Sequence, residues 1–215
     1  MLACPICDNE HPQPYAEDKR RKYYQCPDCH LVFVGKAFLL DANQEFAEYQ
    51  LHENNVDDAG YQRFLTRVSE PLVLKLKQRT ESGLNGLDFG CGPGPALAKM
   101  LTLQGYPTAL YDPFFFDDKQ VLTRTYDFIT CTEAIEHFHK PGEEWSKLMK
   151  LLKPHGWLAI MTKRVLGKDK FQQWHYKNDP THVCFFSEDT FNFLADTSGL
   201  SVEYPSADVV LFHKP

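Results

Sequence analysis

The sequence predicts an α/β protein with a doubly wound, mostly parallel sheet, preceded by a small cysteine-rich module. Three observations indicate this. Four of the seven cysteines lie within the first 29 residues. From about residue 83 onward, short apolar runs alternate with segments of helical period, and the first run ends in an acid and three closely spaced glycines. Alternation of this kind places parallel strands in one layer with helices on both faces.

The bulk composition fits one full-sized domain plus a small appendage. With 215 residues, of which 43% are hydrophobic, the chain can bury a substantial core. Its net charge of -6 argues against a protein-wide attraction to nucleic acid. No apolar run approaches the roughly 20 residues that span a bilayer. The first five residues lack the features of a secretory signal, so we expect no membrane partner and a cytoplasmic location.

Three regions are predicted along the chain. Residues 1–40 form the cysteine-rich module, 41–82 a polar linker followed by a helical lid, and 83–215 the α/β domain. Apolar residues recur with helical spacing from Tyr61, and Pro71 inside that pattern marks either a kink or the start of a second helix. In the α/β domain, strands are expected at 84–89, 108–111, 127–131, 157–162, 201–204 and 209–213, and helices at 95–104, 143–152 and 187–197.

The glycine-rich loop after the first of these strands has the composition of a ligand cradle. Glycine allows positive φ and lets the backbone approach a ligand without a Cβ in the way. The next strand ends at Asp112, where a carboxylate can accept hydrogen bonds from ribose hydroxyls. A dinucleotide-binding loop would need glycine at position 95, which is Pro95 here. The loop therefore predicts a site for a nucleoside cofactor.

Four segments together resemble the class I S-adenosylmethionine-dependent methyltransferases, of the type 11, 12 or 23 kind. Asp88–Gly94 looks like motif I, Asp112 matches the ribose-binding acid, Tyr126–His137 resembles the fourth-strand segment, and Leu151–Leu158 resembles the turn that follows. The resemblance implies a Rossmann-like fold with a seven-stranded sheet, S-adenosylmethionine as cofactor, and in-line methyl transfer that depends mainly on positioning. The segment between Asp112 and Tyr126 departs from the family, because it is short and carries Phe114–Phe116.

The resemblance also implies a set of cofactor-binding residues. Cys91 and Cys131 are interpreted as small apolar fillers at strand ends and not as nucleophiles. The cofactor-binding set is Asp88, Gly90, Cys91, Gly92, Gly94, Asp112, Thr132 and Glu133.

The N-terminal cysteines form two Cys-x-x-Cys pairs separated by 18 residues, Cys4 with Cys7 and Cys26 with Cys29. Four thiolates close a tetrahedral zinc shell and leave no position open for water, which predicts a structural zinc ion in a module resembling a zinc ribbon. Two redox-active pairs are the alternative. Between the pairs lies the basic run Lys19–Lys22, which is either an RNA- or protein-contacting patch or a solvated loop.

The segment Trp174–Ser187 is dense in aromatic and titratable side chains. In the methyltransferases that the chain resembles, a similar segment closes over the acceptor site, which makes His182 and His175 the candidate catalytic residues. Each contacts the acceptor or acts as a base, or is a hydrogen-bonded structural histidine. A metal site built from His175, Asp179 and His182 is a further alternative.

The leading hypothesis is methyl transfer to a small-molecule acceptor, on an O, N or C atom that the sequence does not identify. The alternative is RNA methylation, with the zinc ribbon docking the substrate through Lys19–Lys22. A non-catalytic binding protein is a third hypothesis, but motif I and Asp112 would then be expected to be damaged, and both are intact.

Overall fold

The chain is described from a computed structural model that covers residues 2–51 and 55–215, and within these ranges it forms two sheets. The larger sheet contains β4 (Gly86–Phe89), β5 (Thr108–Tyr111), β6 (Tyr126–Thr132), β7 (Leu152–Met161), β9 (Ser201–Ser206) and β10 (Val209–His213). The smaller contains β1 (Gln13–Glu17), β2 (Lys22–Gln25), β3 (Val32–Val34) and β8 (Cys184–Phe185). The helices are α1 (Ala42–Tyr49), α2 (Ala59–Leu76), α3 (Ala96–Leu103), α4 (Pro141–Leu151), α5 (Lys168–Gln172) and α6 (Glu188–Ser198), with 3-10 turns η1 (Lys36–Phe38), η2 (Lys119–Thr123), η3 (Ile135–His137) and η4 (His175–Asn178).

The larger sheet has the order β5-β4-β6-β7-β10-β9 and is mostly parallel, as predicted. The pairs β4–β5, β4–β6 and β6–β7 are parallel, and only β10 runs against its two neighbours. The expected number of seven strands is wrong for the described part of the chain, where six are present. The missing strand would follow Asp112, but residues 113–125 hold only the turn η2, and a parallel crossover needs a dozen or more residues in addition to the strand itself.

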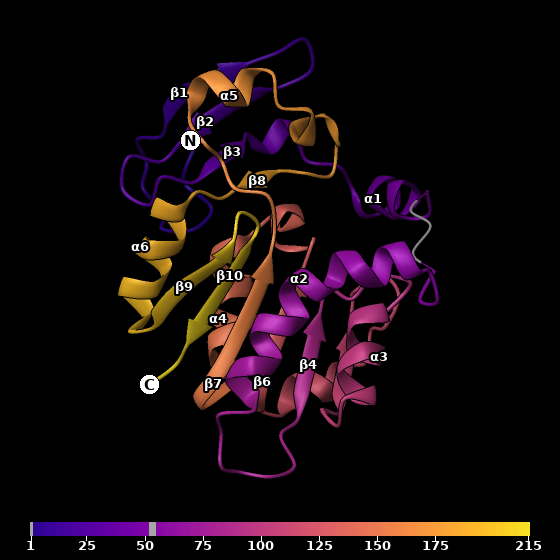
Figure 1. Ribbon diagram of the computed structural model, residues 1–215. Coiled ribbons are helices and arrows are strands. Elements are labelled where there is room, and N and C mark those ends of the chain that lie inside the picture. Colours follow the sequence, from indigo (N-terminus) through magenta and orange to yellow (C-terminus); the bar gives the residue numbers. More distant parts are fainter. Residues whose placement is uncertain (1, 52–54) are drawn as a thin grey trace.

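Helices cover both faces of this sheet, so it is doubly wound (Figure 1). Successive side chains of a strand point to opposite faces. In β7, Trp157, Ala159 and Met161 therefore pack into one buried cluster with α2 and α3. Leu158 and Ile160 pack into the other, with α4 and α6. The near-continuous apolar runs in the sequence reflect this burial on two sides.

Two helices refine the interpretation of residues 41–82. The polar stretch that follows Asp41 was expected to be a linker, but it carries α1, whose first turn is held by a capping box between Asp41 and Gln44. Its residues 52–54 lie outside the described residues. Helix α2 continues through Pro71 without a break, so the proline marks no second helix. Neither α2, with 18 residues, nor any other described helix is long and apolar enough to cross a bilayer.

The N-terminal module lies over the carboxyl ends of the parallel strands (Figure 1). Its sheet is completed by β8, which pairs with β3 although it comes from the far end of the chain. Val183 connects the two parts, because its carbonyl accepts from Val34 N at 3.0 Å and its amide donates to Glu136 O at 2.9 Å. Gly142 approaches the first cysteine loop so closely that a Cβ there would meet Ile6 O at 2.6 Å. The module therefore packs directly against the edge of the sheet where a ligand site is expected.

Candidate active site

A cavity of 510 Å³ opens at the carboxyl ends of β4, β5 and β6. In an open α/β sheet this edge is the usual position for a ligand. The cavity brings together six of the eight residues that the sequence predicts for the cofactor. These are Gly90, Cys91, Gly92, Asp112, Thr132 and Glu133.

The glycine-rich loop needs glycine at two of its positions. Gly90 has φ +75°, and a Cβ there would lie 2.7 Å from the Cβ of Ala134. Gly92 has φ +62°, which side-chain-bearing residues rarely adopt. The loop therefore presents bare backbone to the cavity, as a cradle for a nucleoside ligand requires.

Asp112 fixes the shape of this cradle from the neighbouring strand. Its Oδ2 accepts from Gly92 N at 2.9 Å, and its Oδ1 accepts from Phe114 N at 2.9 Å. Oδ1 also accepts from Phe115 N at 3.2 Å, so Oδ2 is the oxygen that retains a further acceptor position. Because Asp112 also lines the cavity, it is placed to receive hydroxyl donors from a bound ligand.

Asp88 and Gly94 do not line the cavity. Asp88 is buried, and its Oδ1 accepts from Thr130 Oγ1 at 2.6 Å, which links β4 to β6 beneath the loop. Burial raises the pKa of Asp88 to about 6. The carbonyl of Gly94 accepts from Ala96 N at 2.7 Å, at the start of α3. These two residues therefore hold the glycine loop in place from outside the cavity.

Aromatic side chains that the sequence did not assign form much of the cavity wall. Tyr49 from α1, Tyr61 from α2, and Phe114 and Phe115 after β5 all line it. The centroid of the Phe46 ring lies 6.1 Å from that of Phe114 and 5.6 Å from that of Phe115. Phe114 and Phe115, which mark the departure of this segment from the family pattern, thus both lie on the cavity wall. Tyr49 was missed because α1 was interpreted as linker, although Asp41 three residues before Gln44 is the signal of a helix start.

The two candidate catalytic histidines lie in different environments. His182 is 8% exposed and lines the cavity. Its Nδ1 lies 2.7 Å from the carbonyl of Tyr176, which can only accept, so Nδ1 carries the hydrogen and Nε2 keeps its lone pair. Burial is the main reason that the pKa of His182 is lowered, which favours the neutral ring. His175 is exposed on η4 and is not among the residues that line the cavity.

The loop that carries His182 is held by one buried side chain of the N-terminal module. Arg21 is 7% exposed, and its guanidinium donates to four backbone carbonyls between residues 177 and 182. Nη1 contacts His182 O at 2.8 Å and Pro180 O at 3.2 Å, while Nη2 contacts Asp179 O at 2.9 Å and also Lys177 O. We call this set of bonds the Arg21 clamp. It uses the planar fork of arginine, which a lysine cannot reproduce.

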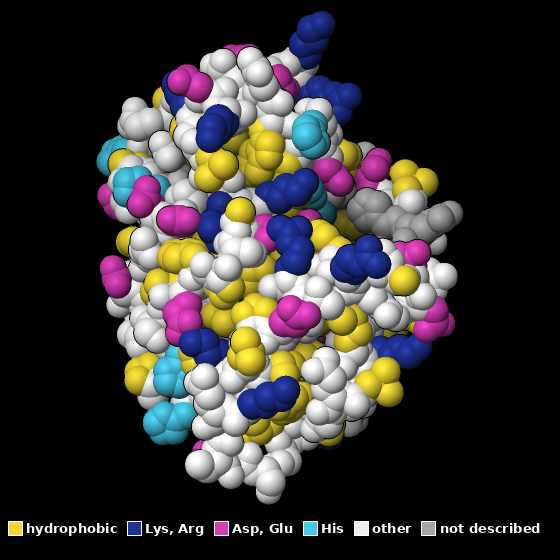
Figure 2. Space-filling model, in the orientation of Figure 1, with side chains coloured by type: hydrophobic (Ala, Val, Ile, Leu, Met, Phe, Trp, Pro, Cys, Tyr) yellow, Lys and Arg dark blue, Asp and Glu magenta, His cyan; other side chains and the backbone are white. Residues whose placement is uncertain are grey.

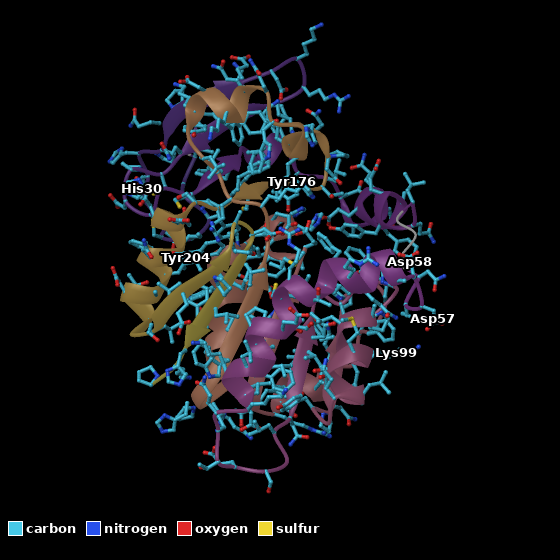
Figure 3. All side chains as sticks on the ribbon, in the orientation of Figure 1. His30, Asp57, Asp58, Lys99, Tyr176 and Tyr204 are labelled. Atoms are coloured by element: carbon cyan, nitrogen blue, oxygen red, sulfur yellow. The ribbon has the colours of Figure 1, made fainter. Side chains whose placement is uncertain are left out.

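A second polar link lies beside the clamp. The buried Lys177 donates to Asp18 Oδ2 at 2.8 Å, and Tyr23 Oη donates to the same oxygen at 2.9 Å. Tyr176, next to Lys177, lies between the module and the larger sheet (Figure 3). The module therefore orders the whole segment from Tyr176 to His182.

The basic run Lys19–Lys22 does not form a patch of four free cations. Arg21 points inward to the clamp, and Lys22 lies 3.7 Å from Glu17. Figure 2 shows Lys and Arg side chains spread over the visible face from top to bottom, with acidic side chains among them. Within this run, Arg21 has a structural function. The sequence alone did not distinguish Arg21 from the neighbouring basic residues.

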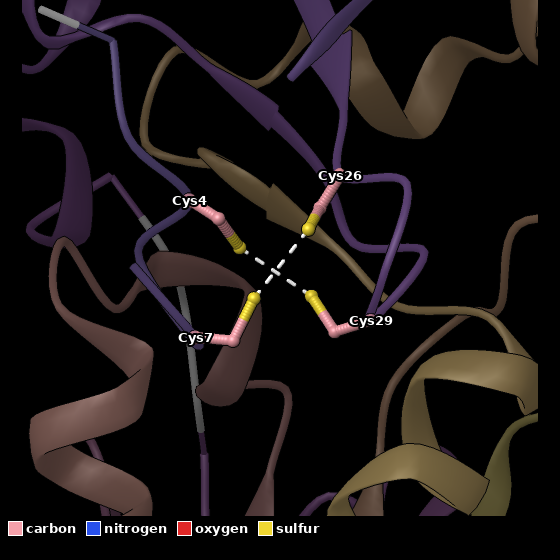
Figure 4. Close-up of side chains that lie close together, drawn as sticks. All are labelled: Cys4, Cys7, Cys26 and Cys29. Carbon is pink, nitrogen blue, oxygen red and sulfur yellow. Dashed lines mark hydrogen bonds between the residues drawn. The ribbon is translucent and has the colours of Figure 1, made fainter. Parts of the chain in front are cut away.

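The four N-terminal cysteines converge on one point (Figure 4). Their sulfur atoms all lie within 4.8 Å of one another, with Cys4 Sγ 3.4 Å from Cys29 Sγ and Cys7 Sγ 3.5 Å from Cys26 Sγ. A tetrahedral zinc shell with Zn–S bonds of about 2.3 Å separates the sulfurs by roughly 3.8 Å. The four sulfur atoms thus form one cluster, with spacings close to those of such a shell.

A glycine cradle braced by an acid at the switch point of a parallel sheet is the site of a protein that binds a nucleoside cofactor. Residues 61–204 match the sequence model of the family described as Methyltransferase domain. The match spans more than half of the chain, so the chain belongs to this methyltransferase family. It is an S-adenosylmethionine-dependent methyltransferase.

Solved structures agree with this fold. The 1,6-didemethyltoxoflavin-N1-methyltransferase of Burkholderia thailandensis, with bound 1,6-didemethyltoxoflavin and S-adenosylhomocysteine, is 16% identical, with a TM-score of 0.53 over 94% of this chain and 99% of that chain. DesVI of Streptomyces venezuelae is 15% identical, with a TM-score of 0.53 over 82% of this chain and 99% of that chain. At these identities the likeness concerns the fold. No curated protein matches the sequence significantly.

The clamp predicts a large effect of one substitution outside the cavity. Arg21→Ala should lower the free energy of unfolding by at least about 2 kcal/mol, because it leaves buried carbonyls without donors. It should also speed amide hydrogen exchange in residues 176–183, measured by mass spectrometry. Arg21→Lys should restore only a small part, and the exposed Lys19→Ala is the matched control. Unchanged exchange in Arg21→Ala would mean that the clamp does not order this loop.

Proposed function

We propose that the chain transfers the methyl group of S-adenosylmethionine to a small-molecule acceptor bound in the 510 Å³ cavity. The observation that carries this proposal is that one cavity is bordered by the glycine loop, by Asp112 and by His182. Its volume falls in the range of about 300–1,000 Å³ typical of small-molecule sites. The Burkholderia relative in fold holds a small heterocyclic acceptor, which supports the same class of acceptor here.

In this proposal the cofactor occupies the half of the cavity next to β4 and β5. The backbone of Gly90, Cys91 and Gly92 contacts the amino-acid portion, and Asp112 accepts from the ribose hydroxyls. Thr132 and Glu133 border the cofactor from β6. Asp88 and Gly94 contribute by supporting the loop and not by contact.

His182 lies on the acceptor side in this proposal. In the transfer, a lone pair of the acceptor atom forms the new bond to the methyl carbon, and the electron pair of the broken C–S bond stays on sulfur. A hydroxyl or amine acceptor must also lose a proton. The neutral His182, with its Nε2 lone pair available, is placed to hold such an acceptor or to assist that loss.

The four cysteines are proposed to hold a structural zinc ion, so that the N-terminal module is a zinc ribbon. The converging sulfurs support this, and four thiolates would leave no open position for catalysis. We further propose that the ribbon orders the acceptor-side loop through the Arg21 clamp. No observation favours RNA as the acceptor, and the cytoplasmic location remains a prediction from the sequence.

Cofactor binding depends on Asp112 in this proposal. Asp112→Asn should weaken binding of S-adenosylhomocysteine at least about tenfold in titration calorimetry, because bonds to a charged acceptor are worth about 1.5–3 kcal/mol. Asp117→Asn, an exposed carboxylate in the same segment, should bind like the wild type. The absence of any binding by the wild-type chain would refute the cofactor assignment.

The acceptor side can be tested before the acceptor is identified. With a donor that carries a tritiated methyl group, the wild type should label the low-molecular-mass fraction of a cell extract and leave RNA unlabelled. His182→Ala should lower this labelling at least about 100-fold, the range for loss of a general acid–base group, while His175→Ala should label like the wild type. Label in RNA, or equal labelling by His182→Ala, contradicts the proposal.

The zinc site makes a separate prediction. The chain purified without chelators should contain one zinc ion per molecule by elemental analysis. Cys26→Ser should lower that content, whereas Cys91→Ser, in the glycine loop, should keep it. A wild-type content far below one ion would remove the zinc ribbon and leave the redox-active pairs as the alternative.

A further inference from the structure

A second group of metal-ligating side chains lies at the acceptor end of the cavity. Glu136 and His137 belong to η3, just after β6, and His182 belongs to the loop that precedes β8. One carboxylate oxygen and one ring nitrogen from each histidine all lie within 4.8 Å of one another. Both histidines line the cavity. The three residues thus converge from two segments that are far apart in the sequence.

The carboxylate of this group lacks the partners that a buried charge requires. Glu136 is 1% exposed, and its Oε1 accepts from the hydroxyl of Tyr176. Its Oε2 is fully buried and has no hydrogen-bond partner among the described residues. Burial raises the pKa of Glu136. An isolated carboxylate in such a place is costly unless a cation or further donors compensate it.

A second buried carboxylate, that of Glu133, lies near Glu136 and adds to the negative charge there. Burial, followed by the charge of Glu136, raises the pKa of Glu133 to about 8. Its Oε1 is likewise buried and without a partner in the described part of the chain. The backbone of Glu133 has φ +47°, a strained conformation for a residue with a side chain. Two carboxyl groups that each have a buried oxygen without a partner among the described residues therefore lie near each other beside the cavity.

The hydrogen bonds of both histidines suit metal binding. Nδ1 of His182 lies 2.7 Å from Tyr176 O, and Nδ1 of His137 lies 3.2 Å from Thr181 O. A carbonyl can only accept, so each Nδ1 carries a hydrogen, and Nε2 is the nitrogen of each ring that can bind a metal ion. Histidines that ligate metals typically donate their other ring N–H to such a carbonyl, which fixes the ring.

We infer that Glu136, His137 and His182 hold a divalent first-row cation such as Mn²⁺, Fe²⁺ or Zn²⁺ at the acceptor end of the cavity. Two imidazoles and one carboxylate form the ligand set that such ions take with further positions open. The open positions face the cavity, because both histidines line it. The cation compensates the charge of Glu136 and adds to the favourable charges of Lys163 and Arg67 that act on the nearby Glu133.

This site deepens the proposed function, on which its role in methylation rests. A hydroxyl acceptor that coordinates the cation loses its proton to solvent more easily, because the positive charge stabilises the anion. The oxygen lone pair then forms the bond to the methyl carbon, and the C–S electron pair remains on sulfur. His182 acts here through the cation as its ligand. The acceptor class becomes an oxygen nucleophile able to bind a metal ion.

The test titrates Mn²⁺ into the full chain and follows free Mn²⁺ by electron paramagnetic resonance. One Mn²⁺ site per chain is expected, and Glu136→Gln and His182→Asn should each weaken it at least about tenfold. The asparagine can still donate to Tyr176 O, so the loop should stay folded, which thermal unfolding checks. His155→Ala is the matched control, since His155 is exposed near the start of β7, at the opposite end of the sheet.

Two outcomes overturn the inference. One is the absence of bound Mn²⁺ together with no binding of Zn²⁺ or Fe²⁺, in which case Glu136 serves only as the hydrogen-bond acceptor of Tyr176. The other is Mn²⁺ affinity that is equal in the wild type and both variants, which places the ion elsewhere. Calorimetry with S-adenosylhomocysteine on the same samples separates this failure from that of the proposed function. Cofactor binding without Mn²⁺ binding refutes only the metal site, and the reverse refutes only the cofactor.

Discussion

The contact between the Arg21 guanidinium and the carbonyls of residues 177–182 is the interaction on which the His182 end of the cavity depends. A loop of this kind has its backbone acceptors turned away from any regular ladder, so they need donors from elsewhere. One arginine supplies them from another sheet. The position of His182 is therefore determined by the N-terminal module as much as by the α/β domain. This gives the small module a structural reason to be present on a methyltransferase.

The two ends of the cavity are built by different physical means. At the end of the cavity beside β4 and β5, the bare backbone of the glycine loop is held by Asp112, whose carboxylate accepts from the amides of Gly92, Phe114 and Phe115. At the end beside His137 and His182, buried carboxylates are left partly without hydrogen-bond partners among the described residues. The bare backbone and the Asp112 carboxylate suit a neutral part of a ligand that has many hydrogen-bond acceptors and donors. The buried carboxylates at the other end suit a positive charge. The two ends of the cavity therefore differ in the ligand chemistry that they suit.

The parts of the site predicted from the sequence are those encoded within a few consecutive residues. The Asp88–Gly94 loop, Asp112 and the cysteine pairs have local signals, because glycine conformation and ligand spacing are set over short distances. Arg21 could not be distinguished from Arg20, since its partners lie more than 150 residues away. The two-residue β8 has no period to detect. The expected seventh strand is missing from the described residues because only 13 residues, 113–125, separate Asp112 from β6. Helix α1 was not predicted because the segment after Asp41 is polar.

The pairing of β8 with β3 also has a consequence for how the protein is made. The N-terminus leaves the ribosome first, so β1, β2 and β3 emerge before the strand that completes their sheet, about 150 residues later. Until then the edge of β3 is open to pairing with other chains. The four clustered cysteines all lie within the first 29 residues, so their side chains can come together before β8 is made. For the same reason, transplanting residues 1–40 onto another enzyme would move an incomplete sheet.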